Sequence, residues 1–101
     1  MSDPAGIPAL QDAIRHMHGV ESRWLGSCPV DETFEGSQVW KGEVQIFSLQ
    51  EHPQAEFCYA WSEASTGNRR RFFAALHVPP VESPAAAVRA SIVADARRNR
   101  N

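Results

Sequence analysis

Long apolar runs are absent from this chain of 101 residues, and so is a secretory signal. No segment approaches the roughly 20 apolar residues that a membrane-spanning helix requires. The first residues, Met1 to Gly6, contain neither the basic region nor the apolar region that directs secretion. We therefore expect a cytoplasmic protein that makes no membrane contact.

Cysteine is scarce as well, since the chain has only Cys28 and Cys58. Thiols stay reduced in the cytoplasm, so we expect two small buried thiols rather than a disulfide. A chain of this length can bury a core without metal or disulfide crosslinks. The sequence therefore predicts one small α+β domain over residues 1–101.

The residue patterns of common catalytic and metal sites are also missing. Gly36 and Gly42 lack the spacing and the following lysine of a phosphate-binding loop. His16 and His18 are two positions apart on a predicted helix, so they point in different directions. The acidic residues are scattered, and no pair can be placed at the separation that two-carboxylate hydrolysis needs. We expect no metal, no cofactor and no catalytic residue, and the sequence favours a protein that is not an enzyme.

Charge is divided unevenly along the chain. Residues 1–63 carry ten acidic and three basic side chains, whereas residues 64–101 carry seven arginines and two acidic side chains, for a total of −2. Arginine binds phosphate well because its planar fork can contact two oxygens. The sequence therefore predicts that anions or nucleic acid would be contacted at a hairpin tip and along the last helix, by Arg69, Arg70, Arg71, Arg89, Arg97 and Arg100. The pI near 6.0 argues against general nucleic-acid binding, which usually involves a strongly basic domain.

Apolar spacing predicts a helix at each end of the chain. The first runs from Ile7 to His18, and Gly19 is a suitable stop. The second runs from Pro84 to about Arg98, with Ser83 as its N-terminal cap.

Period-two alternation between the helices predicts four strands. Pro29 cannot donate a ladder hydrogen bond, so the first strand belongs at a sheet edge or ends there. The alternation of the second strand slips at Phe47, which indicates a bulge or a strand end. The predicted strands cover residues 21–30, 39–49, 56–63 and 70–78, with residues 31–38 as a connection.

The last two strands form a hairpin whose register can be predicted. If one face of the hairpin is buried, the register should place its aromatic side chains together. This choice gives a wholly apolar face that contains Phe57, Tyr59, Trp61, Phe72, Ala74, Leu76 and Val78.

The predicted fold is α-β-β-β-β-α, an antiparallel meander of three or four strands with both helices packed on one face. Without the first strand, the order α-β-β-β-α would resemble double-stranded-RNA-binding domains. That family places lysines at the start of its last helix, whereas this chain has Ser83-Pro84-Ala85-Ala86-Ala87. The resemblance therefore assigns RNA contacts to no residue of this chain.

Three functional hypotheses follow. The first is a non-catalytic protein-interaction domain that binds another protein or a second copy of itself. Its partner surface would be the second sheet face, with Cys58, Ala60, Phe73, Ala75 and His77. The second hypothesis is nucleic-acid binding through the arginines. The third is a small enzyme in which His77 activates the thiol of Cys58.

Overall fold

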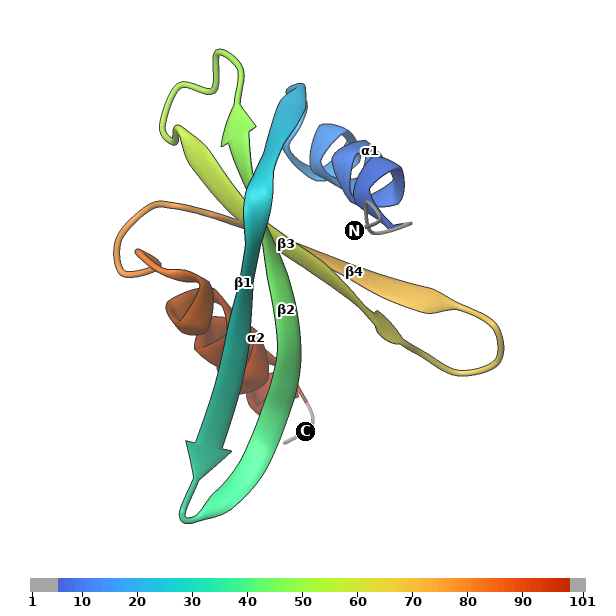
Figure 1. Cartoon of the computed structure of the whole chain (residues 1–101), viewed down its shortest axis with the longest axis vertical. Helices are drawn as coiled ribbons and strands as arrows, with labels where there is room; N and C mark the ends of the chain where they lie inside the picture. The colour runs from blue at the N-terminus through green and yellow to red at the C-terminus, as the bar shows by residue number, and fades with distance from the viewer. Residues whose placement is uncertain (1–5, 99–101) are drawn as a thin grey trace.

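The computed structural model describes residues 6–98 and contains an α-β-β-β-β-α arrangement with one antiparallel sheet (Figure 1). The helices and strands are α1 (Ile7–His18), β1 (Ser22–Phe34), β2 (Ser37–Leu49), β3 (Phe57–Ala64), β4 (Arg70–Leu76) and α2 (Pro84–Arg98). The sheet order β1-β2-β3-β4 confirms the predicted meander and places β1 at an edge. Because β1 is present, the three-stranded alternative and its RNA-binding resemblance do not apply.

Both helices begin or end for the predicted local reasons. Gly19 ends α1 in the left-handed conformation, at φ 74°, and donates its backbone N–H to the carbonyl of Arg15. At the start of α2, the Ser83 hydroxyl accepts a hydrogen bond from the backbone N–H of Ala86 at 3.1 Å.

The two helices lie on opposite faces of the sheet, so the prediction that both pack on one face is wrong. On the α1 face, Ile7, Leu10 and Ile14 pack with Phe47, Cys58 and Ala60. On the α2 face, Ala87 and Val88 pack with Val30, Val44, Tyr59 and Trp61. Each helix contacts mainly a strand from the opposite end of the sequence. The first helix, α1, contacts chiefly β4, and the last helix, α2, contacts chiefly β1.

The β3–β4 register also differs from the prediction, because helices cover both faces of the sheet. Tyr59 pairs with Ala75 and Trp61 pairs with Phe73, so the aromatics of the hairpin are divided between its two faces. Four consecutive residues of β3, from Cys58 to Trp61, are buried. A strand that is buried on both faces needs no polar face, and the assumption of a single apolar face therefore gave the wrong register.

The β1–β2 hairpin is longer than expected, and its irregularities lie elsewhere. β1 continues to Phe34, and β2 begins at Ser37, so the predicted connection over residues 31–38 is wrong. The turn between them contains only Glu35 and Gly36, both with positive φ (52° and 82°), as a tight hairpin turn requires.

The expected irregularity beside Phe47 is a bulge in the neighbouring strand. Trp24 pairs with Phe47 and Gly26 pairs with Ile46, so Leu25 is the extra residue. The bulge turns Trp24 onto the α1 face and Cys28 onto the α2 face. Phe47 itself is fully buried beneath α1 and needs no bulge in β2.

The two hairpins diverge from a short junction. β2 and β3 pair only from Gln45–Ala60 to Ser48–Phe57, and the β1–β2 hairpin extends well beyond these pairs. In Figure 1 the β1–β2 hairpin extends downward, with α2 behind it, while the β3–β4 hairpin extends to the right. The fold therefore leaves the tip of the β1–β2 hairpin beside the last turns of α2.

Candidate interaction surface

Exposed apolar side chains gather between α2 and the tip of the β1–β2 hairpin. A groove between them is lined by Phe34, Val39, Ile92, Val93 and Ala96. Phe34 is 65% exposed, Val39 46% and Val93 48%. Soluble proteins rarely leave contiguous apolar patches uncovered unless the patch binds something.

A second groove follows the other flank of α2. Its lining includes Ala86, Ala90, Val93 and Ala94, with Arg89 and Arg97 beside them. Since Arg89 and Val93 line both grooves, the two grooves form one continuous surface along the outer side of the helix. We call this region, together with Phe34 and Val39, the α2 surface.

Local structure explains why the hairpin contributes to this surface. The two-residue turn ends β1 at Phe34, directly at the tip. In β2, Val39 is an extra residue, because Glu32 pairs with Trp40 and Thr33 pairs with Gln38. A bulge re-aims side chains at a strand end, so Val39 does not follow the regular alternation of β2.

Ion pairs hold α2 against both hairpins. Arg89 lies 3.2 Å from Glu32 of β1, whose side chain is mostly buried. Arg71 of β4 lies 2.7 Å from Asp95, and its guanidinium stands 4.8 Å from the centre of the Phe73 ring. Hydrogen bonding to Asp95 raises the pKa of Arg71. The Arg89–Glu32 pair places part of the basic half of the chain against the acidic half, whereas the Arg71–Asp95 pair lies within the basic half.

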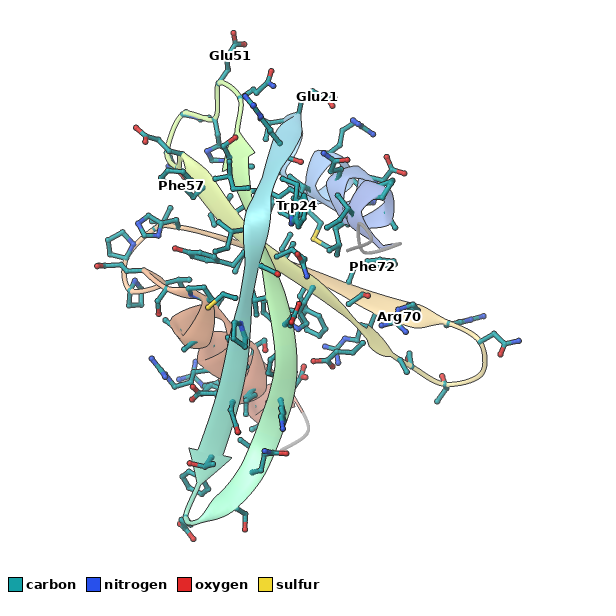
Figure 2. All side chains as sticks on the ribbon, in the orientation of Figure 1. Glu21, Trp24, Glu51, Phe57, Arg70 and Phe72 are labelled. Carbon is teal, nitrogen blue, oxygen red and sulfur yellow. The ribbon has the colours of Figure 1, made fainter. Side chains whose placement is uncertain are left out.

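The structure does not bring the predicted arginines together at one anion site. Arg70 stands on the β3–β4 hairpin, where its Nε donates to the Ser62 hydroxyl at 3.0 Å (Figure 2). Arg69 is exposed at the end of the hairpin loop, and Arg97 is exposed on α2. Arg100 lies outside the described residues. Because Arg71 and Arg89 already pair with carboxylates, the predicted patch offers less free charge than the sequence suggested.

The predicted partner surface is also divided. Cys58 and Ala60 are fully buried beneath α1, whereas Phe73 and Ala75 belong to the opposite, α2 face. In Figure 2, Trp24 and Phe72 mark the side of the sheet on which α1 lies. The five residues therefore form no common surface, because Cys58 pairs with Leu76 and His77 lies on the opposite face.

The same geometry removes the Cys58–His77 pair. Burial raises the pKa of the Cys58 thiol to about 12, which keeps it protonated and unreactive at neutral pH. His77 instead has its Nδ1 atom 2.6 Å from the Tyr59 hydroxyl. The pKa of Tyr59 is raised, first by burial and then by the nearby Cys58 and Glu82.

Within residues 6–98, no group of three or more His, Cys, Asp or Glu side chains is placed to hold a metal ion. In the same part of the chain, no helix has the length and apolar character needed to cross a membrane. The chain matches no protein-family model, no curated protein and no solved structure.

Sequence reasoning missed the α2 surface because its members come from two distant segments. Phe34 lies in a stretch that was interpreted as a connection, and Val93 interrupts a largely small and polar side of the helix. The signal was present in the last helix: Ala86, Ala90 and Val93 follow helical spacing on the side opposite the buried Val88.

Proposed function

We propose that this chain is a non-catalytic protein-interaction domain that binds its partner through the α2 surface. The observation that carries the proposal is the concentration of exposed apolar side chains on one groove. Phe34, Val39 and Val93 come from three different elements, and the fold places them side by side. An apolar patch with charged residues at its border is typical of a protein-binding site.

The distribution of the remaining exposed apolar residues supports this choice. Met17, Leu25 and Phe57 are also exposed, but they lie on α1, at the β1 bulge and at the start of β3. Neither groove of the α2 surface includes any of them. Isolated exposed apolar residues are normal on soluble proteins, whereas a shared groove indicates binding.

The chemistry of the site supports binding rather than catalysis. The side chains of the α2 surface are mainly alkyl groups and one aromatic ring, with Arg89 already paired to Glu32. The cysteines at 28 and 58 are both free, which fits the reducing conditions of the cytoplasm. We therefore place the proposed function in the cytoplasm.

Partner capture with three tagged versions of the chain tests this proposal. Val93→Glu introduces a charge on the α2 surface, and Met17→Glu introduces the same charge on α1. The two positions are matched, since Val93 is 48% exposed and Met17 is 46% exposed, both on helices. We expect the unchanged chain and Met17→Glu to retain the same bound proteins, and Val93→Glu to lose them. The proposal fails if all three versions retain the same set.

A further inference from the structure

The outer side of α2 carries a stripe with a symmetric spacing. Ala86, Ala90, Val93 and Arg97 lie four, three and four positions apart, and all four line the same open groove. At 3.6 residues per turn, this spacing keeps them on one side of the helix, opposite the buried Val88. The order of spacings is the same when it is read from either end.

A symmetric stripe of this kind can pack on a copy of itself. In an antiparallel pair with a two-fold axis between residues 90 and 93, Ala90 meets Val93 of the second helix and Ala86 meets Arg97. Small side chains at Ala86 and Ala90 permit the close approach of two helices, and Val93 then fills the space above them. The contact would cover the exposed side of Val93.

Charge favours this antiparallel direction. Arg97 lies near the end of α2, whereas the exposed Glu82 stands just before its start. In the antiparallel pair, Arg97 of one copy lies beside Ala86 of the other, at the end of α2 that Glu82 precedes by two residues. A long arginine side chain can reach beyond its own position toward that end. A parallel pair would instead bring the two Arg97 side chains together, which is unfavourable.

We propose that the partner of the α2 surface is a second copy of this chain, docked through an antiparallel α2–α2 contact with reciprocal Arg97–Glu82 pairs. This proposal rests on the proposed function, because it names the occupant of the same surface. Its two symmetric halves make an isologous interface, which is the most common form of homodimer.

Sedimentation equilibrium over about 10 to 500 µM provides the first test, because the fraction of dimer rises with total protein concentration. The unchanged chain and Met17→Glu should approach twice the 11.2 kDa of one chain. Val93→Glu should stay at the mass of a monomer over the same range. A dimer that persists in Val93→Glu would overturn the proposal, since the contact would then lie elsewhere. Circular dichroism of each variant shows whether it is folded.

Charge reversal tests the direction of the helices. Arg97→Glu and Glu82→Arg should each weaken the dimer about tenfold, because each change places like charges together at both ends of the interface. The double variant Glu82→Arg/Arg97→Glu should restore the original dissociation constant. If the double variant is as weak as the single ones, the antiparallel arrangement is wrong.

Failure of this inference is separable from failure of the proposed function. A chain that remains monomeric at about 500 µM has no homodimer of useful strength, and the inference is overturned. If Val93→Glu still loses captured proteins in that case, the α2 surface binds a different protein and the proposed function stands. If Val93→Glu changes neither mass nor capture, both proposals fail.

Discussion

Alkaline pH should destabilise this protein through the thiol of Cys58. The side chain is 0% exposed beneath α1, and burial raises its pKa from an ordinary 9.0 to about 12. The folded protein therefore keeps this proton at pH values where the unfolded chain has lost it. Between about pH 9 and 12 the unfolded state binds fewer protons, so the free energy of unfolding falls as pH rises.

The size of the effect follows from the separation of the two pKa values. One pH unit in the middle of this window corresponds to about 1.4 kcal/mol, so raising the pH from about 9.5 to 11 should remove about 2 kcal/mol of stability. For a domain of this size, urea unfolding has a slope near 1 kcal/mol per molar. The urea midpoint should therefore fall by about 2 M over this pH range through the Cys58 thiol alone.

Two alanine variants separate this thiol from the other groups that titrate at high pH. Between the two pH values, the free energy of unfolding of Cys58→Ala should fall by about 2 kcal/mol less than that of the unchanged protein. Cys28→Ala serves as the control for the loss of a thiol elsewhere in the chain, because Cys28 is only half-buried. If Cys58→Ala follows the same pH dependence as the unchanged protein, then Cys58 is not buried as described. Iodoacetamide labelling at pH 8 checks the same burial, since it should modify Cys28 and spare Cys58.

Three further predictions test other parts of the structure. Deletion of the bulge residue Leu25 should preserve cooperative urea unfolding, because Trp24 and Gly26 can then keep their pairs with Phe47 and Ile46 in a regular ladder. Loss of the cooperative transition would contradict the observed register. Glu63→Ala should lower the free energy of unfolding by about 1–3 kcal/mol, because one carboxylate oxygen of Glu63 accepts hydrogen bonds from the indole N–H groups of Trp40 and Trp61. Urea unfolding followed by tryptophan fluorescence measures this loss, and a loss near zero would mean that water replaces the carboxylate. Fluorescence anisotropy with duplex RNA at about 50 and 200 mM salt should show only weak binding, because Arg71 and Arg89 already pair with carboxylates. Micromolar binding that weakens steeply with salt would instead favour the nucleic-acid hypothesis.

The elements of the fold were largely predictable because their signals are local. Gly19 and Ser83 set a helix end and a helix start through contacts within one turn, and both predictions are confirmed. Pro29 predicted that the first strand lies at an edge or ends there, and β1 is an edge strand that continues to Phe34. Element order and the antiparallel meander depend on these local signals and on short connections.

The placement of the helices was not predictable in the same way, because it depends on which faces of the sheet are buried. The unbroken apolar runs around Tyr59 and Ala74 are the pattern of strands covered on both sides. Assigning one apolar face to them fixed the wrong register and put Cys58 and His77 on one face. The candidate site depends on a further long-range contact, in which the tip of the β1–β2 hairpin, with Phe34, lies beside α2. No local pattern contains that information.

Each terminal helix completes the core of strands from the opposite end of the chain, and this arrangement has a consequence for biosynthesis. Until α2 has left the ribosome, the α2 face of the first hairpin has no cover, and Val44 and Trp40 remain accessible to other proteins. The nascent chain is therefore expected to expose this apolar surface until α2 has been synthesised. A product truncated before Ser83 should be a target for chaperones and proteases rather than a stable shorter domain.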